Sequence, residues 1–466
     1  MRLAIAATAV FVLMAAAVQA AEPPKPSAEV KAEARTLFSK MIGFKTQEGS
    51  GQVPAMARYL ADQLKTAGFK DSEIEIVPLG ETAGLLVRYP GKAGSTKAPV
   101  VLMAHMDVVA ASKEDWGGRD PYVLGEEGGS FLGRGVVDNK YGVLGITQTF
   151  MRLRREGFVP DRDLILAFTG DEETTGKTAV VLAARLKGAA YAINSDAGGG
   201  FRGGGNEKAS YALQVAEKTY ATFELTALNS GGHSSAPRPD NAIYDLAAAL
   251  TKISAYRFEA RWNPVTLESF RLTAPGIEGE LGKAMARFAA NPNDKAAIAE
   301  LDKSWVSNEL RTTCVATMLR GGHAENALPV AATATINCRI FPGQTIAEVQ
   351  ATLLKVSGDS KLQIKTIGEP IESDVSVPPE ELRTALAKVL AVRAPGVVAT
   401  PYMEAGATDG LYFRSAGIPT LGVGGLFMSQ GVDYNIHGNN ERLPVAQFDD
   451  GLDHFYLLLK ALTGGE

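Results

Sequence analysis

The 466-residue sequence has no stripe of basic residues and no run rich in lysine or arginine. Nucleic-acid-binding domains carry such clusters, so we expect no nucleic-acid partner. After the first 20 residues, no apolar run has the length of about 20 residues that a transmembrane helix needs. The sequence also shows no internal repeat. A length of 466 residues, 45% of them hydrophobic and 21% charged, predicts a soluble globular protein of two domains.

The N-terminus differs from the rest of the chain. Arg2 precedes an apolar and small-residue run over 3–18, and Gln-Ala-Ala-Glu follows at 19–22. This pattern predicts a signal peptide over residues 1–20, cleaved after Ala20. A transmembrane anchor is the alternative, but the run is shorter than the ~20 residues that a spanning helix requires. No cysteine lies near the cleavage site, which argues against a lipoprotein. We therefore expect a secreted protein, in a bacterial periplasm, with no membrane attachment after cleavage.

Cysteine is scarce, with Cys314 and Cys338 as the two examples. Export allows a disulfide between them, and a pair of buried thiols is the alternative. If the strands that carry them pair as an antiparallel hairpin with Met318 opposite Ala334, then Cys314 lies opposite Cys338. Directly opposed strand residues have Cβ atoms close enough for a disulfide.

Short apolar strands alternate with amphipathic helices in the first part of the mature chain. The expected helices are Ala28–Met41, Val53–Ala67, Tyr141–Arg155 and Thr178–Leu186, and the expected strands are Ile74–Val77, Gly84–Tyr89, Val100–Ala104, Leu164–Thr169 and Tyr191–Asn194. This alternation predicts an α/β domain, a mostly parallel sheet with helices on both faces.

From about residue 211 the pattern changes to one long strand over 211–228, a helix, two strands, a helix and a strand, in the order βαββαβ. That order is typical of a ferredoxin-like two-layer α+β unit. We therefore divide the mature chain into a first domain part at 21–210, an inserted domain at 211–371 and a second part of the first domain at 372–466. The stretch 257–310 is irregular and partly helical, and a closing helix is expected over 445–462.

Acidic and imidazole side chains stand where several of these segments end. They are His105 and Asp107, then Asp138, then Glu172 and Glu173, then Asp196, and finally His437 in an acidic loop near the C-terminus. In α/β sheets, functional residues collect at the carboxyl ends of the strands. A single Asp or Glu at such a place is commonly a helix N-cap. Together, imidazoles and carboxylates suit zinc and related metals, and this number of candidates predicts two metal ions that share a bridging carboxylate. Spacing alone does not identify the bridging residue.

These segments resemble the M20 metallopeptidase family, which includes carboxypeptidases, dipeptidases, aminoacylase and related deacylases. The matching motifs are His105-Met106-Asp107, Gly133 to Asp138, Asp171-Glu172-Glu173, Ser195-Asp196 and His437-Gly438. The resemblance implies a zinc-exopeptidase-like catalytic domain and an inserted lid or dimerisation domain. It also implies two Zn²⁺ ions, for which Co²⁺ or Mn²⁺ can substitute.

The resemblance assigns a role to each residue of the cluster. His105 and Asp196 are implied to bind one zinc, Glu173 and His437 the other, and Asp138, followed by a cis peptide bond to Asn139, to bridge both. Asp107 is implied to orient His105 through its far ring nitrogen. Glu172 is implied to be the general base.

The inserted domain matches the family as well. His233 resembles the lid histidine that reaches, often across a dimer interface, into the partner's site to stabilise an oxyanion. Asn326 is implied to lie near the substrate, and Arg339 to grip its free carboxylate. The family usually has Asp where Asn337 stands. Gly424 falls in a segment that lines the family's site, as does Thr408-Asp409.

One nucleotide-binding pattern is a false match. Residues 198–203 satisfy G-x-G-x-x-G, but the dinucleotide fingerprint requires a helix next, and here more glycine and a strand follow. We therefore interpret these glycines as a flexible turn beside Asp196.

We expect an exported di-zinc enzyme that hydrolyses an amide bond next to a free carboxylate, as a carboxypeptidase or dipeptidase. An N-acyl-amino-acid deacylase is the alternative within the family, and a catalytically silent zinc-binding protein is the alternative outside enzymology. The expected substrate is a small peptide or N-acyl amino acid, and the inserted domain is expected to support a homodimer.

Overall fold

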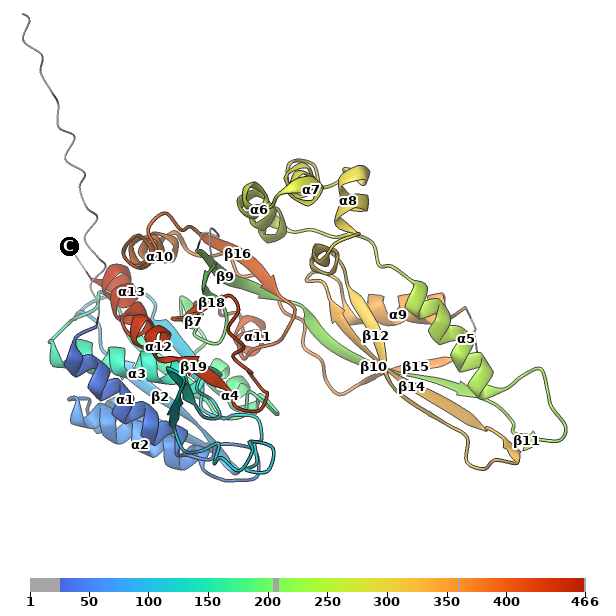
Figure 1. Ribbon diagram of the computed structural model, residues 1–466, viewed down its shortest axis with the longest axis horizontal. Helices are drawn as coiled ribbons and strands as arrows, with labels where there is room; N and C mark the ends of the chain where they lie inside the picture. The colour runs from blue at the N-terminus through green and yellow to red at the C-terminus, as the bar shows by residue number, and fades with distance from the viewer. Residues whose placement is uncertain (1–25, 204–208, 359–360, 465–466) are drawn as a thin grey trace, which may run out of the picture.

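The computed structural model describes residues 26–203, 209–358 and 361–464, which form two lobes (Figure 1). The expected signal peptide, 1–20, lies outside the described residues. Within the described residues, no helix combines the length and apolar character that crossing a membrane would require.

The larger lobe is built on a mixed sheet with ten strands in the described part of the chain, in the order β1-β2-β6-β3-β7-β17-β9-β8-β18, with β16 also paired to β9. The strands are β1 Ile74–Leu79, β2 Thr82–Tyr89, β3 Val100–His105, β6 Leu164–Thr169, β7 Tyr191–Asn194, β8 Gly199–Arg202, β9 Ser210–Glu217, β16 Ala399–Glu404, β17 Thr420–Gly422 and β18 Phe427–Ser429. The central strands β6, β3, β7 and β17 run parallel. The α/β fold class is confirmed, although antiparallel pairs at β1–β2–β6 and around β9 make the sheet mixed rather than mostly parallel.

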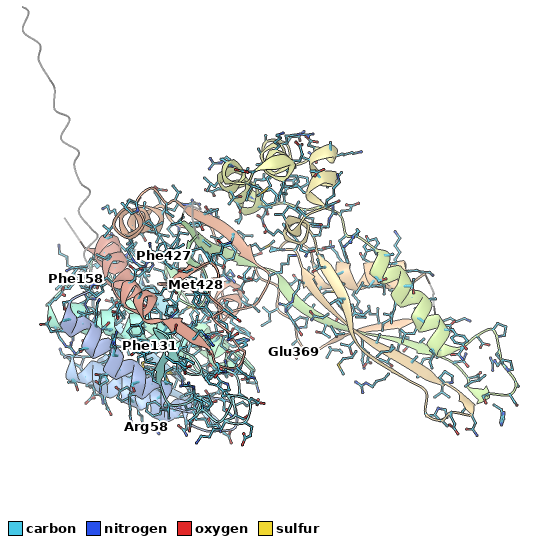
Figure 2. The ribbon with its side chains drawn as sticks, viewed as in Figure 1. Arg58, Phe131, Phe158, Glu369, Phe427 and Met428 are labelled. Atoms are coloured by element: carbon cyan, nitrogen blue, oxygen red, sulfur yellow. A yellow bond between two sulfur atoms is a disulfide. The ribbon has the colours of Figure 1, made fainter. Side chains whose placement is uncertain are left out.

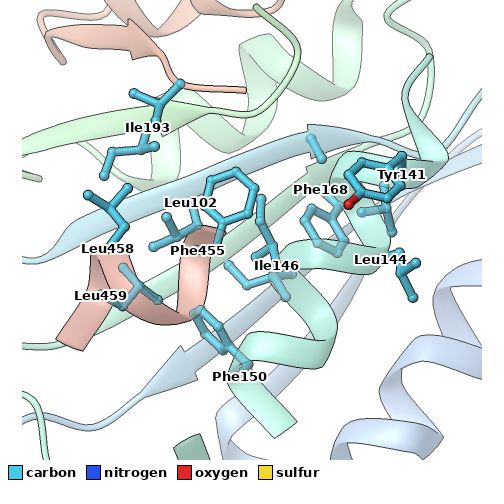
Figure 3. Close-up of a cluster of buried hydrophobic side chains, with 14 of the residues drawn as sticks. Leu102, Tyr141, Leu144, Ile146, Phe150, Phe168, Ile193, Phe455, Leu458 and Leu459 are labelled. Carbon is cyan, nitrogen blue, oxygen red and sulfur yellow. The ribbon is translucent and has the colours of Figure 1, made fainter. Parts of the chain in front are cut away.

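Helices pack against both faces of this sheet. They are α1 Ala28–Ile42, α2 Val53–Thr66, α3 Lys140–Arg155, α4 Lys177–Arg185, α10 Glu380–Arg393, α11 Gly410–Ser415, α12 Val445–Gly451 and α13 His454–Thr463, with a short 3-10 turn, η1, at Asp71–Glu73. Leu102 of β3 joins the core formed with α3 and α13 (Figure 3), whereas Val101 and Met103 join the core against α4 and α11. This alternation buries β3 on both faces and leaves its carboxyl end as the place where polar side chains can emerge.

The smaller lobe is an antiparallel sheet in the order β12-β14-β10-β15, packed against α5 and α9. Its elements are β10 Thr219–Leu228, α5 Ala242–Ala255, β12 Thr313–Gly321, β14 Ala331–Ile340, α9 Ile346–Ser357 and β15 Gln363–Ile367. This is the expected βαββαβ unit. A two-stranded ribbon, β11 Gly232–His233 with β13 Ala327–Leu328, forms its distal tip (Figure 1).

The expected long strand over 211–228 is in fact two strands. β9 pairs with β8 and β16 in the large sheet, and β10 pairs with β14 and β15 in the small one. No glycine, proline or asparagine lies near Lys218, where the chain changes sheet. The strand pattern of the sequence therefore continues past this residue without a break. We therefore place the start of the inserted domain at Lys218 instead of 211, and the chain returns to the larger lobe through the segment that carries Glu369 (Figure 2).

The stretch 257–310 is a compact helical insert. It contains α6 Pro264–Thr273, η2 Ala274–Gly276, α7 Gly279–Ala290, α8 Lys295–Leu301 and η3 Trp305–Leu310, with its own apolar core around Phe270 and Phe288. Arg383 of α10 forms a 3.2 Å ion pair with Glu268 of α6, so the insert also contacts the larger lobe. The closing helix expected over 445–462 is broken at 452–453 into α12 and α13.

Cys314 and Cys338 oppose each other on β12 and β14 and form a disulfide. The predicted register of β12 and β14 is confirmed at the cysteines but is wrong at Met318. A bulge between Ala316 and Met318 places Met318 opposite Thr335 and not Ala334. A bulge adds one residue to one strand, so it shifts every later pair.

Candidate metal centre

The proposed ligands converge at one edge of the large sheet from distant parts of the chain. His105 ends β3, Asp138 lies just before α3, Glu172 and Glu173 follow β6, Asp196 follows β7, and His437 lies in the loop before β19 (Arg442–Pro444). β19 pairs with β5 (Ser130–Leu132), which in turn pairs with β4 (Gly125–Glu127). This small sheet brings the C-terminal loop beside the segment that carries Asp138.

One ligand trio consists of His105, Asp138 and Asp196. His105 Nε2 lies 2.9 Å from Asp138 Oδ1 and 3.3 Å from Asp196 Oδ1. The His105 side chain is only 2% exposed. A buried imidazole that faces two carboxylate oxygens is a donor set suited to a divalent metal.

A second trio consists of Asp138, Glu173 and His437. His437 Nε2 lies 3.0 Å from Asp138 Oδ2 and 3.1 Å from Glu173 Oε1. The two oxygens of Asp138 therefore face different imidazoles. This is the arrangement that a carboxylate would need in order to bridge two ions.

The charges in the centre are unbalanced without a cation. Burial raises the pKa of Glu172 to about 10 and that of Asp196 to about 6. Hydrogen bonds to Asp138 and Glu173 raise the pKa of His437 to about 10. Protons are held because carboxylates crowd a buried space. A pair of divalent cations would neutralise the same charge, so the residues fit a metal centre.

Asp107 contacts His105 through the far ring nitrogen, as the family resemblance implied, and it also makes contacts that the resemblance did not imply. His105 Nδ1 lies 3.5 Å from the Asp107 carboxylate and 3.1 Å from the Asp107 main-chain oxygen. The carboxylate also accepts the backbone N–H groups of Glu172, at 3.2 Å, and Glu173, at 3.0 Å. Asp107 therefore anchors the turn that presents both glutamates.

Asn139 is a neighbour of the centre that sequence reasoning left without a role. The peptide bond between Asp138 and Asn139 is cis, as the resemblance implied. Asn139 Nδ2 donates to Asp196 Oδ1 at 2.9 Å, which links the bridging segment to the ligand after β7. The position of Asn139 directly after Asp138 was the only signal in the sequence.

The structure does not bring the lid residues to the centre of the same chain. His233 is exposed on β11, where its ring lies 2.8 Å from Ser235 Oγ, and the Asn326 main-chain oxygen accepts the N–H of Ser234 beside it. Both lie at the tip of the small lobe, at the opposite end from the larger lobe (Figure 1). His323 is exposed on the chain leading into this tip.

Arg339 lies near the joint between the lobes. Its guanidinium stacks over the Tyr220 ring, with 4.6 Å to the centroid, and donates to the Ala405 main-chain oxygen at 3.1 Å. Arg339 therefore lies closer to the larger lobe than the tip of the smaller lobe does. Its guanidinium contacts a tyrosine ring and a main-chain oxygen of the protein itself.

Gly424 lines a pocket beside the ligands. The pocket has a volume of about 160 Å³ and is bordered by Asp138, Asp196 and the apolar side chains of Met428 and Ile436. Figure 2 marks the position of Met428 on the larger lobe. The glycine-rich segment beside it is not a loose turn, because Gly199–Arg202 forms β8 and pairs with β9 and β18. The pocket gives an apolar group a place next to the bridging carboxylate.

Comparisons with known proteins agree with this geometry. The family model described as peptidase family M20/M25/M40 matches residues 101–461. The human N-fatty-acyl-amino acid synthase/hydrolase PM20D1 is 28% identical over 382 residues, which cover 78% of this chain and 74% of that protein. The probable carboxypeptidase S-like 2 of Dictyostelium discoideum is 25% identical, over 81% of this chain and 74% of its own length.

Solved structures match the fold. The dipeptidase Dug1p of Saccharomyces cerevisiae superposes with a TM-score of 0.64 at 18% identity, covering 94% of this chain and 97% of that one. The shared architecture therefore extends over both lobes.

Proposed function

Since the chain belongs to peptidase family M20/M25/M40 and is a hydrolase of C–N amide bonds, we propose that it cleaves an amide bond next to a free carboxylate with two zinc ions. The observation that carries this proposal is Asp138, whose two oxygens face His105 and His437 at 2.9 and 3.0 Å. Imidazole and carboxylate ligands suit zinc, and Co²⁺ or Mn²⁺ would suit the same donors.

Two cations held by these residues would polarise the carbonyl and lower the pKa of a water molecule. Glu172 would be the group that accepts a proton from the water and returns it to the leaving amine. Asp107 holds the turn that keeps Glu172 in place.

Our first choice of substrate is a dipeptide or a peptide cleaved at its C-terminus. Arg339 would grip the free carboxylate, because a planar guanidinium can bind both carboxylate oxygens. An N-acyl amino acid is the second candidate. It is favoured by the apolar border of the Gly424 pocket and by the likeness to a relative named as an N-fatty-acyl-amino acid synthase/hydrolase.

We also propose export and a homodimer. The signal-peptide pattern at 1–20 and the disulfide between Cys314 and Cys338 both support export to the periplasm, because disulfides persist in oxidising compartments. The edge strand β12 exposes Val315, Met318 and Leu319, an apolar edge that pairing with a second copy would cover. A partner's lid could then bring His233 to this centre.

The test uses the mature chain from residue 21, with a panel of dipeptides, N-acyl amino acids and the same compounds with an amidated C-terminus. We expect hydrolysis of compounds with a free carboxylate, loss of activity with a chelator and recovery with Zn²⁺. Equal hydrolysis of amidated compounds would contradict the carboxylate requirement. Activity that survives complete metal removal would contradict the metal mechanism.

A further inference from the structure

A buried ion pair joins the segment that carries Asp138 to the loop that carries His437. Arg134 and Glu441 are 2% and 0% exposed, and Arg134 Nη1 donates to Glu441 Oε2 at 2.9 Å. The two residues are 307 positions apart in the sequence. Neither reaches the metal positions itself, so their effect on the centre must pass through the backbone.

Glu441 organises the turn before the bridging residue. Its Oε2 also accepts the N–H of Gly135 at 2.8 Å, and its Oε1 accepts the N–H groups of Val137 at 2.8 Å and Asp138 at 3.1 Å. Gly135 has a φ of +86° and lies close to Val108, so this turn has a shape that few residues adopt. A carboxylate satisfied by three backbone donors and a guanidinium holds that shape rigidly.

Arg134 organises the other side. Its Nη2 donates to the main-chain oxygens of Gly438 at 2.8 Å and His437 at 3.3 Å. Three non-glycine residues of this loop, Asn435, His437 and Asn440, have positive φ angles of 49°, 61° and 57°. Such conformations persist only where the surroundings enforce them.

We propose that Arg134 and Glu441 are positioning residues that set the distance between Asp138 and His437 and thereby assemble the second metal position. The inference rests on the proposed two-ion centre. Two ligands of the first metal position, His105 and Asp196, lie at the ends of β3 and β7. The large sheet fixes these two residues without the help of Arg134 or Glu441. The second position needs His437, which no strand holds, and its loop is bound to the Asp138 segment through this pair.

The experiment compares Zn²⁺ binding to the metal-free full-length mature chain by calorimetry and by metal content after dialysis. The variants are Arg134→Lys and Glu441→Gln. A lysine retains the buried cation but cannot bond Glu441 and two carbonyl groups together. A glutamine turns one acceptor into a donor against backbone N–H groups.

The control is Arg414→Lys. Arg414 forms an equally buried pair with Glu217, at 2.6 Å with both 1% exposed, and its hydrogen bonds go to Ser373 and Thr420 rather than to a ligand. Far-UV circular dichroism and thermal melts of the metal-free chains report the loss of stability common to all three variants.

We expect the first zinc, whose position shares only Asp138 with this network, to lose less affinity than the second, which should bind Arg134→Lys and Glu441→Gln about 10- to 100-fold more weakly. Arg414→Lys should bind both ions normally. Wild-type affinity for both ions in the two variants, or an equal loss for both ions, would overturn the inference. A wild type that binds fewer than two ions would instead overturn the proposed function.

Discussion

Glu172 and Glu173 are adjacent residues whose side chains serve different parts of the metal centre. Glu173 Oε1 lies 3.1 Å from His437 Nε2, whereas among the described residues Glu172 belongs to no ligand group that contains Asp138. Asp107 binds both of their backbone N–H groups, which fixes the turn and lets the side chains diverge. Under the proposed function, this fixed turn would separate the roles of proton carrier and ligand.

Replacing the proton carrier should abolish turnover and spare the metals. For Glu172→Gln we expect kcat to fall about 10²- to 10⁴-fold, because an amide cannot accept and return the proton. Metal content should stay at the wild-type value. The matched control, Glu173→Gln, should weaken binding of the second ion. Full activity of Glu172→Gln would show that another group is the base.

At the scale of elements, the joint between the lobes is a buried polar contact. Lys218, between β9 and β10, donates to the main-chain oxygens of Asn308 and, at 2.6 Å, Arg311, at the end of the helical insert. Burial lowers the pKa of Lys218 to about 8 and raises that of Glu309, beside it, to about 7. The insert is therefore attached to the joint by groups that titrate outside their usual ranges.

This attachment predicts a pH dependence of stability. Because the pKa of folded Glu309 is about 7 and its ordinary value 4.5, the folded chain keeps a proton that the unfolded chain releases. The stabilisation is complete below the ordinary value and is lost as the pH rises through about 7. Wild type should therefore lose stability relative to Glu309→Gln between about pH 5 and about pH 8.

Urea unfolding at the two pH values measures this difference. Glu300→Gln, on the outer side of α8, is the control for removing a carboxylate from the insert. Parallel pH profiles for wild type and Glu309→Gln would contradict the assignment.

The smaller lobe contains a disulfide that links the edge strand β12 to β14. It closes a loop with a sequence separation of 24, so its removal frees the unfolded chain. For the double variant Cys314→Ala and Cys338→Ala we expect a loss of about 3 kcal/mol in the free energy of unfolding. The same loss should follow reduction of wild type. A non-reducing peptide map of exported protein that finds both thiols free would exclude the bridge.

At the scale of the whole molecule, the lid tip lies at the opposite end from the larger lobe (Figure 1). If His233 serves the centre of a partner chain, two inactive variants should complement each other. A dimer of Glu172→Gln with His233→Ala contains one complete site, because intact Glu172 in one chain meets intact His233 from the other. In a symmetric dimer of this kind, both lids would face the partner's centre in the same way.

Mixing the two variants under conditions that exchange subunits should restore up to about half of the wild-type activity for each mixed dimer. Size-exclusion chromatography with light scattering establishes the dimer first. The control mixes Glu172→Gln with Glu173→Gln, both of which damage the catalytic lobe and retain His233. A monomeric wild type with full activity would contradict the role of a partner.

Much of the fold was predictable from local patterns. Leu102 and its neighbours alternate between two cores, and the apolar spacing of α1, α2 and α3 agrees with their observed bounds to within one or two residues. These features depend on the period of a strand or a helix, which a short window of sequence contains. The break at Lys218 and the bulge before Met318 were not predictable, because pairing partners more than a hundred residues away, or on another strand, determine them.

For the metal centre, residue types and their places after strands nominated a set of acidic and imidazole candidates, and the family resemblance selected His105, Asp138, Glu173, Asp196 and His437 among them. Their contacts required the folded chain. Asp138 faces two imidazoles, Asp107 binds the turn of the two glutamates, and Arg134 pairs with Glu441. These contacts join residues 33 to 307 positions apart. Chemical identity is local to a residue, whereas distance between side chains is a property of the packed molecule.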